Sequence, residues 1–271
     1  MESNPNKIHT VHLTDEKATL LIPLYAKALD NLSKHSILHD EKSDEIVNMI
    51  DYDFEKLNNF GNGNVMVIRA RQLDEWVKEF LKLNPNAVVL NLGCGLDTRI
   101  NRINPSSDVS RFDLDFPEVI EERQNFYSNH DGYQMIESSI TETKWLEKIP
   151  KNRPVIIVAD GVLEYLTEEE VKELLNRVTS YFPCGEIAFD VMNSFAIKMG
   201  KSSLKETTGA THKWAVDDIR NVDNLNPKLK RINCIPILRS KYFPLKFRIV
   251  YGIMTIVPHV RNMIRLLRYE F

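Results

Sequence analysis

Two glycines and a downstream acid are the first candidates for chemistry in this sequence. Residues 87–92 form a short apolar, β-branched run, and Gly93, Cys94 and Gly95 follow it directly. Glycines in such a turn let a ligand approach the backbone without a Cβ in the way. Asp115 lies 22 positions after Gly93, close to the spacing at which a carboxylate meets a ribose in nucleotide-binding βαβ units. The pattern predicts a nucleoside site at the carboxyl ends of two adjacent parallel strands.

The loop departs from the dinucleotide-binding pattern Gly-x-Gly-x-x-Gly in two ways. Thr98 replaces the third glycine, and Asp97 places a negative charge where a phosphate would sit. Both changes count against an NAD-dependent oxidoreductase, which is the first alternative. They favour a ligand that carries positive charge, such as the sulfonium of S-adenosylmethionine.

The residues around this loop resemble the signature of the leucine carboxyl methyltransferase family, which includes the tetracenomycin-type polyketide O-methyltransferases. Residues 91–99 read Asn-Leu-Gly-Cys-Gly-Leu-Asp-Thr-Arg, and residues 113–120 read Asp-Leu-Asp-Phe-Pro-Glu-Val-Ile. Residues 19–28, 69–74 and 160–167 are also similar to family segments, so that the likeness spans residues 14–192. The resemblance implies a class I S-adenosylmethionine-dependent O-methyltransferase.

The resemblance also implies roles for individual cofactor residues. The glycine loop would line the cofactor, and Asp115 would bind the ribose hydroxyls. Arg69 would pair with the methionine carboxylate, for which a guanidinium fork is suited. Lys27 falls near a basic position that contacts the same carboxylate. The alternatives are a surface ion pair for Arg69 and a solvated side chain for Lys27.

The likeness extends to the adenine and methyl ends of the cofactor. Ser139 and Ile140 stand where the family has an acidic and an apolar residue that hold the adenine. Asp160 stands where the family usually has Glu, near the transferring methyl, and Tyr165 keeps the family's tyrosine. Asp160 and Tyr165 are therefore the catalytic candidates, with a packed core tyrosine as the alternative for Tyr165. The departures at Ser139 and Asp160 leave a second alternative, a module that binds the cofactor without transferring its methyl.

The cysteines and histidines give no sign of a redox or metal site. Cys94, Cys184 and Cys234 have no Cys-x-x-Cys spacing, which fits a reducing compartment. Cys94 is interpreted as a small residue packed under the ligand, in contact with the cofactor, and not as a nucleophile. His35 and His39 are four residues apart, but no third ligand accompanies them, so we expect no metal.

The chemical class of the methyl acceptor can be argued from whether the transfer needs a base. A carboxylate is already ionised at neutral pH, whereas a phenol or an alcohol would need a base. His212 is the best candidate base, with a surface histidine as the alternative. Together with Trp214 and Asp217 it is a candidate substrate contact in residues 192–228. This favours a carboxylate or an acidic phenol, on a small molecule or on a protein terminus.

The pattern of hydrophobic residues indicates the elements that must position this site. Strands and helices alternate, which predicts an α/β fold with a Rossmann-like, doubly wound, mostly parallel sheet. Residues 1–271 would form one domain, with a helical cap or lid in 1–85, a cofactor-binding core in 86–192, and a substrate-side insertion with closing strands in 193–271. The expected strands are 87–92, 109–115, 133–136, 154–159 and 185–191, and helices are expected at 14–33, from 65, at 116–128 and from 167. Residues 40–64 are expected to be a mobile loop.

Composition sets the outer limits on function. The chain has 271 residues, 43% hydrophobic and 27% charged, with a net charge of −3. This charge gives no reason to expect nucleic acid or a membrane as partner. Residues 1–12 lack the order of a signal peptide, and the apolar run 249–258 is too short to span a bilayer. We therefore expect a cytoplasmic protein whose oligomeric state is open.

Overall fold

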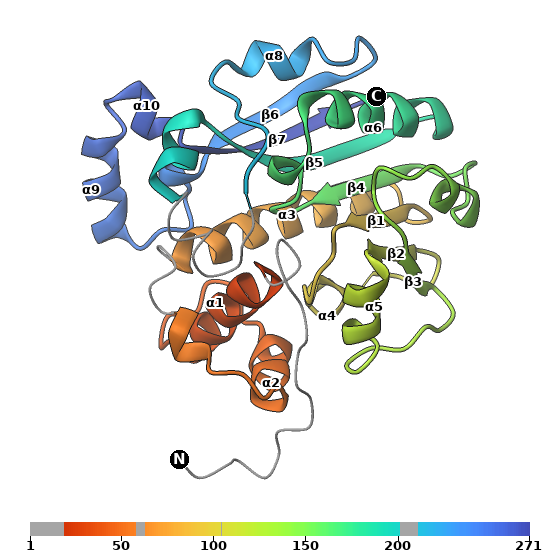
Figure 1. Ribbon diagram of the computed structural model, residues 1–271, viewed down its shortest axis with the longest axis horizontal. Helices are drawn as coiled ribbons and strands as arrows, with labels where there is room; N and C mark the ends of the chain where they lie inside the picture. The colour runs from red at the N-terminus through yellow and green to blue at the C-terminus, as the bar shows by residue number, and fades with distance from the viewer. Residues whose placement is uncertain (1–18, 58–62, 104, 201–210) are drawn as a thin grey trace.

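The computed structural model describes residues 19–57, 63–103, 105–200 and 211–271. The strands are β1 (Val88–Leu92), β2 (Ser110–Asp115), β3 (Tyr133–Glu137), β4 (Val155–Ala159), β5 (Gly185–Met192), β6 (Lys230–Pro236) and β7 (Ile264–Glu270). They form one sheet in the order β3-β2-β1-β4-β5-β7-β6 (Figure 1). Strands β1 to β5 are parallel, and β7 is antiparallel to both β5 and β6. The expected doubly wound, mostly parallel sheet is confirmed.

Helices cover both faces of the sheet. The α-helices are α1 (Leu21–Asn31), α2 (Glu41–Met49), α3 (Gly63–Leu83), α4 (Arg99–Arg102), α5 (Pro117–Arg123), α6 (Glu168–Tyr181), α8 (Ile219–Asp223), α9 (Leu245–Met254) and α10 (Pro258–Arg261). Residues 194–200 are also helical. Short 3₁₀ turns are η2 (Phe54–Leu57), η3 (Lys144–Lys148), η4 (Leu163–Tyr165) and η5 (Ile237–Arg239). None of the helices in the described residues is both long and apolar enough to cross a bilayer.

Alternate residues of the central strands supply two separate hydrophobic cores. On β4, Ile157 belongs to the core that includes Leu174 of α6. Its neighbours Ile156 and Val158 belong to the core that includes Trp76 of α3. Since successive side chains of a strand point to opposite faces, a strand covered on both sides must be apolar throughout. This is why β4 was recognisable as a buried strand from its sequence.

The segment that was expected to be a loop is largely helical. Asp40 caps α2 by accepting a hydrogen bond from the Ser43 amide at 3.1 Å. Ile46 and Ile50 are fully buried, and Phe54 continues the same four-residue spacing. The polar residues between them hid this apolar stripe. The expectation of a loop in residues 40–57 is therefore wrong, while residues 58–62, the glycine- and asparagine-rich part, lie outside the described residues.

Other differences concern where elements begin and end. Helix α1 begins at residue 21, and residues 14–18 lie outside the described chain. Helix α5 ends at Arg123, earlier than the expected residue 128. Closing strands were expected within residues 193–271, but the bounds of β6 were not predicted, because its residues are only partly buried and give no clear alternation. The C-terminal residues close the sheet as expected, but β7 lies between β5 and β6 instead of at the edge.

Candidate active site

The candidate cofactor site lies at the carboxyl ends of β1 and β2. Gly93 and Gly95 have φ angles of 60° and 49°, in the left-handed region that glycine adopts without strain. The Gly95 amide donates to Asp115 Oδ2 at 2.7 Å, and the Phe116 amide donates to Oδ1 at 2.8 Å. Burial raises the pKa of Asp115 to about 6, although the two amide bonds act in the opposite direction. The structure thus brings together the glycines and the acid that the sequence singled out.

The Arg123 side chain supports the glycine loop through hydrogen bonds to its backbone. The side chain is fully buried, and its Nη1 donates to the carbonyl oxygens of Gly95 at 3.1 Å and Asp97 at 2.7 Å. Its Nη2 pairs with Asp113, and its Nε donates to the Tyr133 hydroxyl at 3.2 Å. Sequence reasoning missed Arg123, because one arginine at the end of a helix gives no signal that its side chain will contact the glycine loop.

Cys94 packs within the protein beside the loop. It is buried in a small cluster with Ile120, Tyr133 and Met135. Burial raises the pKa of the Cys94 thiol well above its usual value. The thiol is therefore neutral at physiological pH, as expected for a packing residue and not for a nucleophile.

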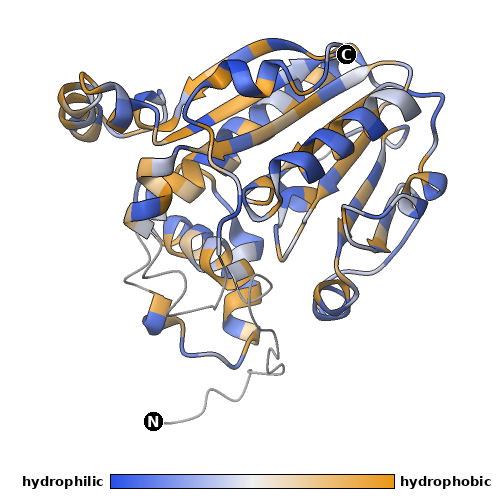
Figure 2. Cartoon of the chain, turned by 45° about the horizontal axis from the view of Figure 1, so that its top comes forward, coloured by the Kyte–Doolittle hydropathy of each residue, from blue (hydrophilic) through white to orange (hydrophobic). Residues whose placement is uncertain are grey.

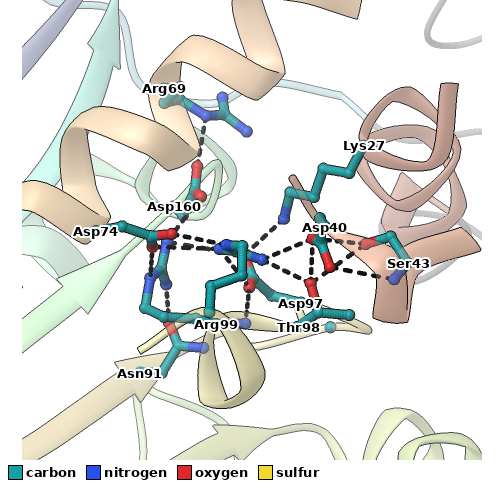
Figure 3. Close-up of polar contacts among 12 residues, drawn as sticks. Lys27, Asp40, Ser43, Arg69, Asp74, Asn91, Asp97, Thr98, Arg99 and Asp160 are labelled. Carbon is teal, nitrogen blue, oxygen red and sulfur yellow. Dashed lines mark hydrogen bonds and ion pairs between the residues drawn. The ribbon is translucent and has the colours of Figure 1, made fainter. Parts of the chain in front are cut away.

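Behind the loop, buried acids and bases form one continuous network (Figure 3). The ion pairs are Lys27–Asp97 at 2.7 Å, Arg102–Asp97 at 3.1 Å, Arg102–Asp40 at 2.9 Å, Arg102–Asp74 at 2.6 Å, Arg99–Asp74 at 2.8 Å, Arg99–Asp160 at 3.2 Å, Arg69–Asp160 at 2.5 Å and Arg69–Asp190 at 2.9 Å. Lys27 comes from α1 and Arg69 from α3, so the network joins the N-terminal helices to the strand tips. Arg99 and Arg102 were not assigned a role from sequence, although Arg99 closes the recognised stretch 91–99.

Asp97 does not present the uncompensated charge that the sequence suggested. Its carboxylate is paired with Lys27 and Arg102, and the Arg99 amide donates to it at 2.6 Å. Burial alone would raise the pKa of Asp97, but Arg102, Lys27 and Arg99 together lower it well below the usual range. Asp97 is therefore an ionised structural carboxylate, and selection against phosphate must rest on other residues.

Three carboxyl groups surround Arg69. Asp160 and Asp190 pair with it directly, whereas Glu164 Oε2 is buried without a hydrogen-bond partner in the part of the chain that the structure describes. Burial, followed by the charge of Asp190, raises the pKa of Glu164 to about 8. Burial also raises the pKa of Asp190. Asp160 differs, because Arg69 and Arg99 outweigh its burial and lower its pKa.

The buried network carries more acids than bases. Its carboxyl groups are Asp40, Asp74, Asp97, Asp160, Glu164 and Asp190, and its cationic groups are Lys27, Arg69, Arg99 and Arg102. Glu164 holds its proton at pH 7, which leaves five carboxyl groups against four cations, an excess that favours a bound cation. A pyrophosphate would increase the excess, whereas a sulfonium would reduce it. The residues present therefore fit S-adenosylmethionine better than a dinucleotide.

Comparison with known proteins leads to the same cofactor. Residues 13–179 match the family model described as leucine carboxyl methyltransferase. The chain belongs to this family. It is 38% identical over 268 residues to the tetracenomycin polyketide synthesis O-methyltransferase TcmP of Streptomyces glaucescens, which covers 97% of this chain and 99% of that protein. It is 31% identical over 243 residues to an S-adenosyl-L-methionine-dependent methyltransferase of Gibberella zeae, covering 81% and 82% of the two chains.

Solved structures show the same fold at low sequence identity. A DUF574 family protein of Streptomyces avermitilis has a TM-score of 0.58 at 9% identity and covers 90% of this chain and 96% of its own. Mycolic acid cyclopropane synthase, solved with S-adenosylhomocysteine, has a TM-score of 0.51 at 11% identity and covers 95% and 98%. This member of the leucine carboxyl methyltransferase family is thus an S-adenosylmethionine-dependent enzyme with the class I fold. Neither an NAD-dependent oxidoreductase nor a non-catalytic module is supported by these relatives.

The residues expected to hold the adenine lie beside the tip of β2. The Ser138 amide donates to the carbonyl oxygen of Asp115 at 2.9 Å, which places the following residue next to the candidate cofactor site. The Ser139 hydroxyl is 2.8 Å from the Thr141 hydroxyl. The Ile140 side chain is buried in the main core, so its packing alone explains its apolar character. Contacts of Ser139 and Ile140 with the adenine stay a prediction.

Tyr165 and His212 meet, although they are far apart in sequence. Their ring centroids are 5.3 Å apart, and the Tyr165 side chain is hydrogen-bonded to Thr19, just ahead of α1. Burial lowers the pKa of His212, so its imidazole is neutral at pH 7. The contact is made because the backbone amides of Lys213 and Trp214 both donate to the Glu164 carbonyl oxygen.

The other two candidate substrate contacts have structural partners. Trp214 is buried in the main core, and its Nε1 is 3.4 Å from Glu168 Oε2. Asp217 accepts hydrogen bonds from the Ser194 amide at 3.0 Å and the Ser194 hydroxyl at 2.9 Å, at the start of the helix at 194–200. Packing and helix capping therefore account for both residues. Among the described residues no group of three or more His, Cys, Asp or Glu side chains could hold a metal ion.

The buried Glu164 predicts an unusual dependence of stability on pH. The folded state keeps the Glu164 proton up to about pH 8, while the unfolded chain loses it near the ordinary value of 4.5. The free energy of unfolding must then fall as the pH rises between these values and level off above pH 8. Glu164→Gln is expected to remove the part of this loss that Glu164 causes, on the order of 3 kcal/mol. The raised pKa values of Asp115 and Asp190 act in the same direction, so a smaller fall remains in the variant. Urea unfolding at pH 5 and pH 8 measures it.

Glu169→Gln is the matched control for this experiment, because Glu169 is an exposed acid at the start of α6. This variant should lose stability between pH 5 and pH 8 as the wild type does. The lowered pKa values of Asp97 and Asp160 act below their ordinary value of 3.8, outside this window. An unchanged slope in Glu164→Gln would show that Glu164 is not the group that holds the proton.

Proposed function

We propose that this methyltransferase transfers the methyl group of S-adenosylmethionine to an oxygen atom of a small molecule, with a carboxylate as acceptor. The name of the matched family and the name of the Streptomyces glaucescens relative both support transfer to oxygen. The observation that carries the choice of a carboxylate is the state of Asp160. This acid, which the family resemblance puts near the transferring methyl, is paired with Arg69 and Arg99 and stays ionised. Its lowered pKa makes it a poor base for a hydroxyl acceptor.

The proposed cofactor contacts follow the geometry of the strand tips. Asp115 would accept from the ribose hydroxyls, and the backbone of the Gly93–Gly95 turn would line the cofactor. Val162 and Leu20 fill the sides of Gly93 and Gly95 on which a Cβ would project. Lys27 would present its remaining Nζ protons, and Arg69 its Nη2, to the methionine carboxylate. Asp160 would keep its negative charge near the sulfonium. Cys94 would pack behind the turn.

The remaining work of the protein is positioning and exclusion of water. S-adenosylmethionine supplies an electrophilic methyl group, so the chain needs to hold the acceptor oxygen in line and keep water out. Residues at the start of α1 are placed for exclusion, because a Cβ on Gly95 would lie 3.3 Å from the Leu20 Cβ. The hydrogen bond between Thr19 and Tyr165 fixes this part of the chain over the strand tips.

His212 provides a test that separates the two acceptor classes. It is the neutral imidazole beside Tyr165, and a phenol or alcohol acceptor would depend on it as a base. For a carboxylate acceptor, His212→Asn should change kcat/KM by about twofold or less, since no proton is removed. For a hydroxyl acceptor the same variant should lose about a hundredfold or more. Asp217→Asn, which alters an acid held by Ser194, is the control for disturbance of residues 211–218.

The direct experiment uses cofactor labelled in its methyl group with two matched panels, aromatic carboxylic acids and the corresponding phenols. A methyl ester releases labelled methanol in mild alkali, whereas a methyl ether does not. We expect alkali-labile label from the acids. Alkali-stable label from the phenols alone would overturn the choice of acceptor, and no transfer to either panel would count against a small-molecule acceptor.

A further inference from the structure

Helix α9 carries a row of aliphatic side chains that no other part of the described chain covers. None of its residues is buried, and it lies at one end of the sheet (Figure 1), where the turns of α9 are coloured mainly hydrophobic in Figure 2. Leu245, Ile249 and Ile253, spaced by one helical turn, are 69%, 60% and 67% exposed. Exposed aliphatic side chains in this region are Leu245, Ile249, Val250, Ile253, Met254, Ile256 and Val257. We call residues 241–261 the α9–α10 corner.

The helix is anchored by its opposite side, so this exposure is not a sign of a detached segment. The Tyr251 ring packs on Phe243 at 4.9 Å and on Phe247 at 6.0 Å between centroids, and Phe243 is buried. Arg239 of η5 donates to the Thr255 hydroxyl at 3.2 Å and holds the end of α9. The aliphatic row is therefore held outward by the fold. A contiguous apolar surface of this kind marks an interaction site.

The charges that residues 224–269 carry are all of one sign. Between Asp223 and Glu270 the sequence has no acidic residue, although the whole chain is slightly acidic. Lys241, Lys246 and Arg248 are exposed and make no ion pair with the described residues. The basic residues of this acid-free stretch are Lys228, Lys230, Arg231, Arg239, Lys241, Lys246, Arg248, Arg261, Arg265 and Arg268. Lys230, Arg231 and Arg268 are paired with acids outside the stretch, so Lys241, Lys246 and Arg248 supply the basic charge beside the row.

We propose that the α9–α10 corner rests on the surface of an anionic lipid bilayer. Aliphatic side chains on a short helix, flanked by lysine and arginine, are the pattern of a segment that lies in the interface between headgroups and acyl chains. Basic residues at such a surface are attracted to anionic headgroups. Helix α9 has 10 residues and spans about 15 Å, so it lies on a bilayer and does not cross it.

A second copy of the chain fits this surface less well. In a two-fold symmetric contact the same patch meets itself, so the basic patch of one copy would lie against the basic patch of the other. The aliphatic row also lacks the exposed tryptophan and tyrosine anchors that are enriched in protein interfaces. An anionic bilayer satisfies the apolar row and the basic flanks together.

The corner also lies on the functional edge of the sheet. Strand β6 runs parallel to β5, because both are antiparallel to β7. The chain therefore leaves β6 for η5 and α9 at the same edge at which β1, β2 and β4 deliver the cofactor residues. A protein resting on this corner presents its active-site edge toward the lipid. This placement does not depend on which acceptor the enzyme uses.

Vesicle sedimentation with the full chain tests the proposal. We expect binding to vesicles of phosphatidylcholine and phosphatidylserine at least about tenfold stronger than to phosphatidylcholine alone, and weakened by high salt. Ile249→Glu/Ile253→Glu should lower binding by about tenfold or more. Leu83→Glu is the matched control, because Leu83 is 82% exposed at the end of α3, outside the corner. Its binding should equal that of the wild type.

A charge series separates the electrostatic contribution. Lys246→Gln/Arg248→Gln should weaken binding by about fivefold per residue, while the exposed pair Lys144→Gln/Lys151→Gln should have no effect. Circular dichroism and thermal denaturation establish that each variant is folded. Failure of the wild-type protein to sediment with anionic vesicles overturns the proposal, as does equal loss in Leu83→Glu. A dimer in sedimentation velocity that Ile249→Glu/Ile253→Glu makes monomeric, without vesicle binding, would assign the corner to a second copy.

Discussion

Replacement of Asp115 by alanine is expected to weaken binding of S-adenosylhomocysteine by about a hundredfold or more. The carboxylate joins the Gly95 amide at 2.7 Å and the Phe116 amide at 2.8 Å, and it is the proposed acceptor for the ribose hydroxyls. Hydrogen bonds to a charged group contribute roughly 1.5–3 kcal/mol each. Loss of the two proposed bonds from the ribose hydroxyls to Asp115 therefore corresponds to about a hundredfold or more in the dissociation constant. Calorimetric titration of the purified protein measures the dissociation constant directly.

Two further variants make this result specific. Asp115→Asn keeps the size of the side chain and one acceptor oxygen, so it should bind more tightly than Asp115→Ala. Glu137→Ala removes an acid that is exposed at the end of β3 and is the sheet neighbour of Asp115. This control should bind as the wild type does. If all three variants bind equally, the strand-tip acid does not hold the nucleoside, and the placement of the cofactor is wrong.

Replacement of Arg123 by methionine should lower the free energy of unfolding by about 3–5 kcal/mol. Methionine preserves most of the buried volume, but it leaves Asp113 without its cation and the Gly95 and Asp97 carbonyl oxygens without a donor. An unpaired buried charge costs more than the pair contributed, because its desolvation is no longer compensated. Urea unfolding followed by circular dichroism measures the loss.

The double variant Arg123→Met/Asp113→Asn should recover part of this stability, since it removes the stranded charge. Arg231→Met is the control at the surface: its pair with Asp223 is partly exposed, and its loss should cost about 1 kcal/mol or less. The Arg123→Met protein should also bind S-adenosylhomocysteine more weakly than the wild type, because the glycine loop is no longer supported. If Arg123→Met and Arg231→Met lower the free energy of unfolding equally, the buried Arg123–Asp113 pair does not stabilise the loop more than a surface pair would.

The sequence alone determined the features that depend on near neighbours in the chain. Strand β4 was recognisable because coverage on both faces requires an unbroken apolar run, and α6 because Thr167 and Glu170 form a capping box within four residues. The glycine turn and Asp115 were found together because parallel strands bring their carboxyl ends to one edge. In each case the physical cause acts over one element or one βαβ unit, so it leaves a local pattern.

Only the tertiary structure decided which charges the site contains. Asp97 looked free in the sequence, but Lys27 arrives from α1, 70 positions away, and neutralises it. Arg69 and Asp190 are 121 positions apart and meet only when α3 packs against β5. Glu164 became a buried acid for the same reason, with no hydrogen-bond partner for its Oε2 among the described residues. The aliphatic row on α9 became a surface because none of the described segments packs over it. Desolvation and ion pairing depend on every group within a few ångströms, and the sequence order does not record those distances.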